Sequence, residues 1–178
     1  MQTHRLTVHP AFVPAAVKSV TARWGRVGQG RLMLRYRLDG SSEVNLPKPA
    51  HRGRGSDLWK TTCCELFLAL GEGRYREFNF SPSGQWAAYD FTGYRMLVGD
   101  YQPVSEPRIS VDRSRSALIL TVLLDAAELA RSAHAQMAVV VEEHKHRLSY
   151  WAARHCGLKP DFHNPTCFVV PVPSAKRA

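Results

Sequence analysis

The sequence lacks any long hydrophobic run. No window approaches the roughly eighteen consecutive apolar residues that a membrane-spanning helix requires. Near the N-terminus, Thr7, His9 and Pro10 interrupt the apolar stretch that a secretory signal would need. We therefore predict a protein with no membrane partner that remains in the cytoplasm.

Cysteine is scarce, with four residues in the chain. Cys63 and Cys64 are adjacent and poorly placed to pair with each other, and Cys156 and Cys167 lack the spacing of zinc ligands. In a reducing cytoplasm this pattern favours buried free thiols over a disulfide framework. We expect no metal site and no disulfide.

No internal repeat or linker divides the chain. Its 178 residues suffice for one hydrophobic core, so we predict a single domain over residues 1–178. The formal net charge of +9 would suit an anionic partner, but the basic residues are dispersed and no nucleic-acid-binding motif is present. The charge therefore predicts a basic, solvated surface and no nucleic-acid partner, and it leaves the oligomeric state open.

Period-two alternation dominates the pattern of apolar residues. In residues 31–38, Leu and Tyr side chains alternate with arginines, which predicts a half-buried strand. Residues 117–124 are apolar on both faces, as in a central strand, and residues 168–172 are typical of a final strand. One short helix is expected near residues 126–132, with Asp125 as its N-cap. Short strands separated by turns predict an all-β fold, an antiparallel β-sandwich or barrel.

Two hairpins occupy the centre of the chain. The first turns at Gly71-Glu72-Gly73, and centring it on Glu72 places Glu65 opposite Asn79 and Phe67 opposite Glu77. One face then carries these residues together with Tyr75. We call it the polar face. The other face carries a core set: Cys64, Leu66, Leu68, Phe78 and Phe80.

The second hairpin turns at Ser81-Pro82-Ser83-Gly84. Centring that turn places Trp86 opposite Asn79 and Ala88 opposite Glu77, so that both extend the polar face. Flat aromatic rings and planar polar groups recognise sugars. The face therefore predicts a saccharide site. The alternative is a buried hydrogen-bonded network that joins Glu65, Glu77 and Asn79 to arginine or tyrosine side chains nearby, among them Arg76, Tyr94 and Arg95.

Four motifs in this sequence resemble those of the bacterial stand-alone DOMON-like proteins, which are related to family 9 carbohydrate-binding modules. They are L-W-x-x-T-x-x-E-x-F at 58–67, E-F-N-F-S-P-S-G-x-W-A-A-Y-x-F-x-x-Y-R at 77–95, S-Y-W-A at 149–152 and K-P-D-F-H-x-P-x-C-F at 159–168. The resemblance implies a β-sandwich of the DOMON type that binds sugars or haem without catalysis.

In the sugar-binding relatives, aromatic residues clamp a saccharide beside acidic and amide groups. The resemblance therefore implies ligand contacts by Trp59, Trp86, Glu77 and Asn79. Three further residues complete the site that we predict: Glu65, Arg95 and, in the last motif, His163. We expect a non-catalytic module for a carbohydrate-like small molecule.

Three other functions remain open at this stage. A haem would need an axial methionine, from Met33, Met96 or Met137, with His163 or His146, and no C-x-x-C-H attachment motif is present. The alternating Glu142, His144 and His146 could share one strand face, as metal ligands do. Glu65 and Glu77 could also serve as the two carboxyl groups of a glycoside hydrolase.

Overall fold

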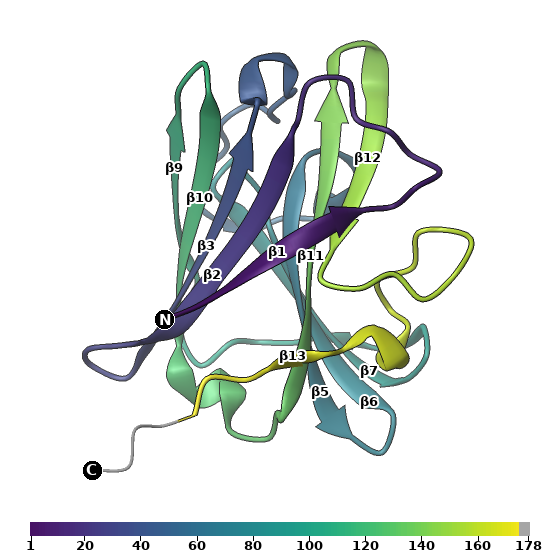
Figure 1. Ribbon diagram of the computed structural model, residues 1–178. Helices are drawn as coiled ribbons and strands as arrows, with labels where there is room; N and C mark the ends of the chain where they lie inside the picture. The colour runs from purple at the N-terminus through teal and green to yellow at the C-terminus, as the bar shows by residue number, and fades with distance from the viewer. Residues whose placement is uncertain (175–178) are drawn as a thin grey trace.

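The computed structural model describes residues 1–174, which form two facing sheets of mostly antiparallel strands (Figure 1). The first sheet has the order β1-β2-β3-β10-β9. Its strands are β1 (Gln2–Val8), β2 (Ser19–Val27), β3 (Arg31–Asp39), β9 (Arg108–Arg113) and β10 (Ala117–Asp125).

The second sheet carries the two central hairpins and runs in the order β7-β6-β5-β11-β12. The short β4 and β8 both pair with β7, and β13 pairs with β11. Its strands are β4 (Gly53–Arg54), β5 (Cys63–Gly71), β6 (Arg74–Phe80), β7 (Gln85–Gly93), β8 (Met96–Asp100), β11 (His134–Glu143), β12 (Arg147–Ala152) and β13 (Val170–Pro171).

Strand β1 belongs to both sheets. Residues 2–6 pair with β2, whereas Thr7 and Val8 pair with β12, so the chain passes from one sheet to the other within one strand. Between the sheets lies the main hydrophobic core, to which both contribute large side chains such as Trp24 and Phe78. The Tyr36 hydroxyl donates to the main-chain oxygen of Glu65 at 2.8 Å and so ties the sheets together. The predicted all-β sandwich is confirmed.

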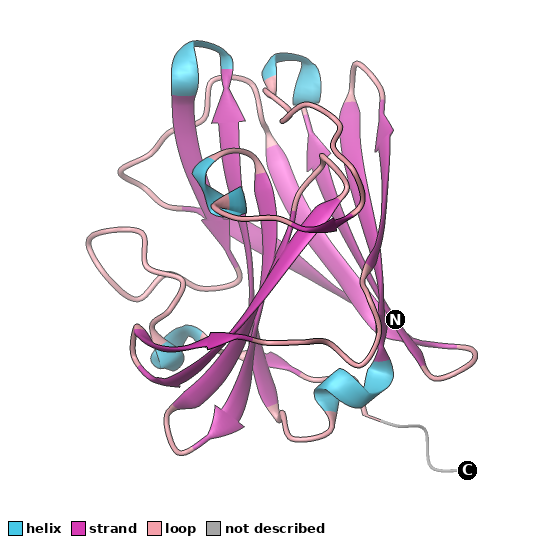
Figure 2. Ribbon diagram, turned by 180° about the vertical axis from the view of Figure 1, so that it is seen from behind, coloured by secondary structure: helices cyan, strands magenta, loops and turns pink. Residues whose placement is uncertain are grey.

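Five short 3-10 helices lie in the connections between strands (Figure 2). They are η1 (Ser41–Glu43), η2 (Leu58–Lys60), η3 (Ala126–Leu129), η4 (His144–His146) and η5 (Pro165–Cys167). The helix predicted near 126–132 is η3, shorter than expected, and Asp125 caps it by accepting from the Ala127 N–H at 2.9 Å. No helix within residues 1–174 is long and apolar enough to span a membrane.

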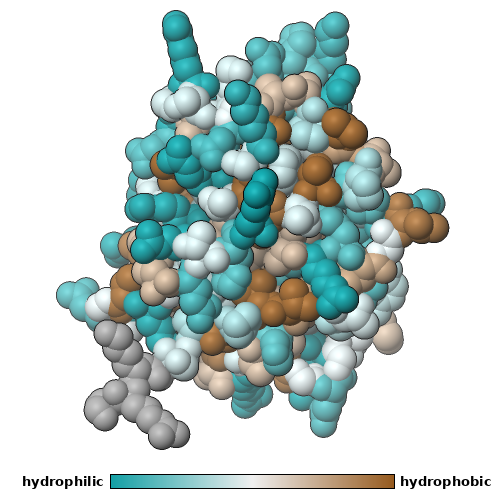
Figure 3. Space-filling model, viewed as in Figure 1, coloured by the Kyte–Doolittle hydropathy of each residue, from teal (hydrophilic) through white to brown (hydrophobic). Residues whose placement is uncertain are grey.

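The strands predicted from alternation are present. In β3 the side chains of Leu32, Leu34, Tyr36 and Leu38 are buried, and the arginines lie on the other face. Strand β10 is less enclosed than predicted, because its second face is only half-buried. In the view of Figure 3, hydrophilic residues cover most of the surface and apolar ones form small groups between them.

The predicted register of the first hairpin is confirmed. Glu65 pairs with Asn79 and Phe67 with Glu77, so that both carboxyl groups lie on the polar face. The turn places Glu72 and Gly73 at positive φ, the geometry of a two-residue hairpin loop. The register shifts by one residue between Ala69 and Gly71, because Leu70 has no partner on β6.

The predicted register of the second hairpin is wrong by one residue. Asn79 pairs with Ala87 and Glu77 with Tyr89, whereas Trp86 pairs with Phe80. The loop has three residues rather than two, because Ser81 pairs directly with Gln85. Gly84, at φ 94°, supplies the left-handed residue that such a loop requires. One added residue turns the whole of β7 over.

Trp86 therefore lies in the core between the sheets. Its side chain is 2% exposed, and the Arg54 guanidinium stacks over its ring at 4.7 Å. On the polar face, the residues of β7 are instead Ala87, Tyr89 and Phe91.

The two tryptophans of this region should differ sharply in their effect on stability. We expect Trp86→Ala to lower the free energy of unfolding by about 3–5 kcal/mol, because it empties a core position. Trp59→Ala should change it by only about 0.5 kcal/mol, because Trp59 is 51% exposed. Chemical denaturation of both variants measures the difference, and equal losses would contradict this placement of the two rings.

Candidate functional site

A cavity of about 480 Å³ opens on the polar face of the second sheet. Strands β5, β6, β7, β11 and β12 all contribute to it, and residues 160–163 and η2 lie at its sides. Its volume is in the range of small-molecule sites. Aromatic rings make up much of its wall: Trp59, Tyr89, Phe91, Tyr150 and Phe162.

Five of the seven predicted site residues line this one cavity: Trp59, Glu65, Glu77, Arg95 and His163. Asn79 lies behind them, fully buried, and holds Glu77 rather than reaching the cavity. Trp86 faces the opposite side of the sheet, so the structure does not bring it to the site. Ala87 takes the place opposite Asn79 that was predicted for Trp86, and Tyr89 takes the place opposite Glu77 that was predicted for Ala88.

Only one of the two carboxyl oxygens of Glu77 accepts a hydrogen bond from a residue of the described chain. Its Oε1 accepts from the Asn79 amide at 2.7 Å, and its Oε2 lies 3.7 Å from the His163 Nε2. Burial raises the pKa of Glu77 to about 7, against the opposing effects of the Asn79 hydrogen bond and the Arg95 charge. This carboxyl group therefore keeps its proton to a higher pH than an exposed glutamate does.

Glu65 lies beside Glu77 on the neighbouring strand and is 3% exposed. Burial is the larger of two effects that raise the pKa of Glu65 well above its usual range, and the charge of Glu77 is the smaller. Cys63, on the same face of β5, is also kept neutral, because burial and the nearby Glu65 raise the pKa of its thiol. Two adjacent buried carboxyl groups cannot both ionise cheaply, so they titrate as a pair.

Tyr75 is hydrogen-bonded both to the His163 ring and to the main chain of Arg95. The Tyr75 oxygen accepts from the Arg95 main-chain N–H at 3.1 Å and lies 2.8 Å from the His163 Nδ1. In the tautomer that carries the imidazole hydrogen on Nε2, toward Glu77, the Tyr75 hydroxyl donates to Nδ1. Burial, together with the Arg95 charge, lowers the pKa of His163 to about 4, so the ring is neutral at physiological pH.

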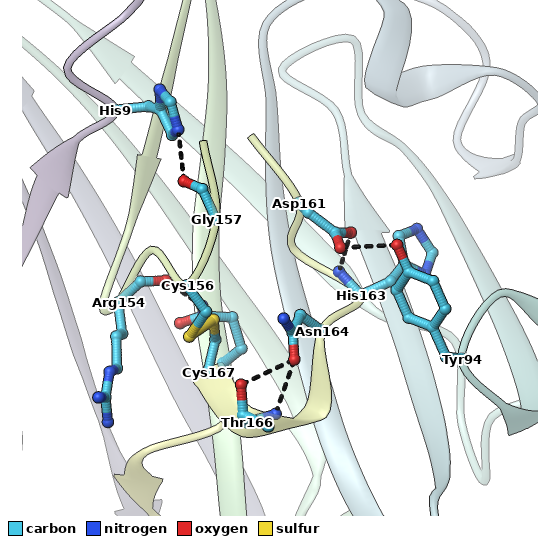
Figure 4. The surroundings of a disulfide bond; sticks show 11 residues. His9, Tyr94, Arg154, Cys156, Gly157, Asp161, His163, Asn164, Thr166 and Cys167 are labelled. Carbon is cyan, nitrogen blue, oxygen red and sulfur yellow. Dashed lines mark hydrogen bonds between the residues drawn. A yellow bond between two sulfur atoms is a disulfide. The ribbon is translucent and has the colours of Figure 1, made fainter. Parts of the chain in front are cut away.

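Arg95 and Asp161 form the rim of the cavity. The Arg95 guanidinium donates to Asp161 Oδ1 at 2.9 Å, and the Tyr94 hydroxyl donates to Oδ2 at 2.8 Å. Asp161 also accepts from the His163 main-chain N–H at 3.3 Å, a local hydrogen bond within the turn (Figure 4). These contacts join the turn after β7 to the segment that covers the site.

The segment from residue 153 to 169, which we call the closing segment, covers one side of the cavity. A disulfide between Cys156 and Cys167 ties its two ends (Figure 4). The prediction of four free thiols is thus wrong for this pair, whereas Cys63 and Cys64 are free and buried. The separation of eleven residues gave no signal, because η5 and the fold of the segment bring the two sulfurs together.

Several cavity residues were missed by the sequence analysis. Tyr89 and Phe91 were assigned to the core because of the register error. Tyr150 lies within the S-Y-W-A motif and Phe162 within the last motif, so the motifs contained a signal for both. Val140 and Pro160 add apolar surface from β11 and the closing segment.

The two metal-based alternatives find little support in the geometry. His144 and His146 belong to η4 rather than to a strand, and His146 Nδ1 lies 2.5 Å from Glu142. Within residues 1–174 no group of three or more metal-ligating side chains occurs. Of the candidate haem ligands, His163 lines the cavity, but no methionine of the described chain joins it there.

The raised pKa of Glu77 makes stability depend on pH. The folded state binds this proton more tightly than the unfolded state, so the stabilisation is present at pH 4–5 and is lost as pH rises through about 7. We expect Glu77→Gln to reduce the fall in unfolding free energy between pH 5 and pH 8 by on the order of 2 kcal/mol. Glu72→Gln, at a side chain that is 85% exposed, is the control. An unchanged pH dependence in Glu77→Gln would contradict this electrostatic description.

Comparison of the sequence with protein-family models and with curated proteins found no match. Comparison with solved structures found a similar fold in a Bacteroides uniformis protein described as a "putative carbohydrate-binding protein". The two superpose with a TM-score of 0.68 over 94% of this chain and 84% of that chain, at 16% sequence identity. At this identity the likeness concerns the fold: the chain shares its β-sandwich architecture with that protein.

Proposed function

We propose that the protein is a non-catalytic binding module for a carbohydrate-like small molecule, held in the cavity on the polar face. The observation that carries the proposal is the composition of this cavity. It combines aromatic side chains with planar polar groups in a volume of about 480 Å³. The shared fold with the Bacteroides uniformis protein supports it only at the level of architecture.

The aromatic side chains provide stacking surfaces. Trp59 lies at the side of the cavity with half of its surface exposed, so its indole is available to a ligand. Tyr89 and Tyr150 lie on β7 and β12, on opposite sides of the two carboxyl groups. Rings of this kind pack against the C–H surface of a pyranose.

The polar groups provide both halves of a hydrogen bond to hydroxyl groups. Glu65 and Glu77 present acceptor oxygens, whereas Arg95 and the His163 Nε2–H are donors. A hydroxyl group needs a donor and an acceptor together, which neighbouring groups of opposite type supply. The network from Tyr75 to His163 holds the imidazole in place before a ligand arrives.

Calorimetric titration with a panel of mono- and disaccharides tests the proposal. At least one saccharide should bind to the wild type, and Trp59→Ala should weaken that binding about tenfold through the loss of one stacking surface. Leu158→Ala, at a residue that is 97% exposed and does not line the cavity, should bind as the wild type does.

Two results would contradict the proposal. One is the absence of saccharide binding across the panel, or binding that Trp59→Ala leaves unchanged. The other is turnover of aryl glycosides that Glu77→Gln abolishes, because this would make the carboxyl pair a catalytic acid and base.

A further inference from the structure

Within residues 1–174 the Glu65 carboxyl group has no hydrogen-bond or ion-pair partner. It is 3% exposed and lines the cavity, yet neither of its oxygens accepts a hydrogen bond or forms an ion pair with any residue of the described chain 1–174. Burying such a group without a partner is costly. Natural proteins satisfy nearly all buried polar groups, so an unpaired carboxyl that faces a cavity indicates a group that the ligand supplies.

Glu77 adds a second incompletely satisfied carboxyl group at the same place. Only its Oε1 accepts a hydrogen bond, from Asn79. The distance of 3.7 Å between Oε2 and the His163 Nε2 is too long for a hydrogen bond. The floor of the cavity thus offers acceptor oxygens from two adjacent strands, with few donors of the protein directed at them.

No cation of the described chain neutralises this pair directly. Arg95 is already bound to Asp161, and its side chain is 53% exposed. His163 is neutral, since its pKa is about 4. The other titratable groups on the polar face carry no positive charge: Cys63 on β5, Tyr75 on β6, Tyr89 on β7 and Tyr150 on β12. Arg76 of β6 lies on the opposite face, where it binds Asp90 and Glu128.

The walls of the cavity suit a cation as well. The faces of aromatic rings attract an ammonium group, most strongly when it is removed from water. Trp59, Tyr89, Phe91, Tyr150 and Phe162 all line the space above the two carboxyl groups. A positive group that reaches the floor would therefore meet carboxylate oxygens below it and aromatic rings around it.

We propose that the ligand of this cavity carries a protonated amino group, in the manner of an amino sugar, and that its ammonium donates hydrogen bonds to Glu65 and Glu77. This inference rests on the proposed saccharide function and names the ligand class for the same site. The ammonium supplies three donors and the positive charge that the carboxyl pair lacks. Binding shifts the pair toward its ionised form and releases a proton.

Calorimetric titration at pH 6 with four probes tests the saccharide function and the proposed amino group separately. The probes are glucosamine, glucose, N-acetylglucosamine and cyclohexylamine. We expect glucosamine to bind at least about tenfold more tightly than glucose and N-acetylglucosamine, as a charged hydrogen bond to a buried carboxylate implies. Cyclohexylamine, which lacks the hydroxyl groups, should bind more weakly than glucosamine.

The other outcomes are distinct. Equal binding of glucose and glucosamine would contradict the proposed amino group of the ligand, but it would agree with the saccharide function. Binding of cyclohexylamine without binding of any sugar would overturn the saccharide function. Binding of none of the four probes would overturn both.

Two isosteric variants locate the selectivity. Glu65→Gln should abolish the preference for glucosamine over glucose, whereas Glu106→Gln, which removes an exposed carboxylate outside the cavity, should retain it. A preference that survives in Glu65→Gln would overturn the proposal. Should Glu65→Gln fail to fold, the wild type supplies the test: titration in two buffers of different ionisation enthalpy must show net proton release with glucosamine, and its absence overturns the proposal.

Discussion

Two carboxyl groups lie side by side beneath an apolar cavity, and the cost of charging both of them governs this half of the molecule. Glu65 and Glu77 occupy adjacent strands on the same face, in a place where burial penalises the ionised form of each. The surrounding groups do little to relieve that cost, because His163 is neutral and Arg95 is bound to Asp161. The cavity therefore presents acceptor oxygens that the surrounding residues leave without a directly bound cation.

Turn geometry and the closing segment create this arrangement. The first hairpin brings Glu65 and Glu77 to one face, and the three-residue loop that ends at Gly84 brings Tyr89 to the same face. The segment between Cys156 and Cys167 then covers the face with Pro160 and Phe162 and positions His163. Neither part is sufficient alone, since the strands provide the floor and the segment provides one wall.

Much of this could be predicted from the sequence, and the errors have definite causes. Alternation in β3 and the turn at Glu72 gave the fold class and the pairing of β5 with β6, because period two is a direct consequence of strand geometry. The place of Trp86 could not be read reliably, because one residue more in a loop inverts a strand. The Cys156–Cys167 pairing depends on the path of an irregular segment, for which no periodic signal exists.

The protonation state of the carboxyl pair tests the account most directly. Carbon-13 NMR of labelled glutamate side chains, assigned with Glu65→Gln and Glu77→Gln, follows each carboxyl group from pH 4 to pH 9. The account predicts that the pair titrates in two steps, both above the ordinary range of a glutamate carboxyl group, with Glu77 near pH 7. Titration of both Glu65 and Glu77 in the ordinary range of an exposed glutamate would contradict it, because the floor of the cavity would then be an ordinary solvated surface.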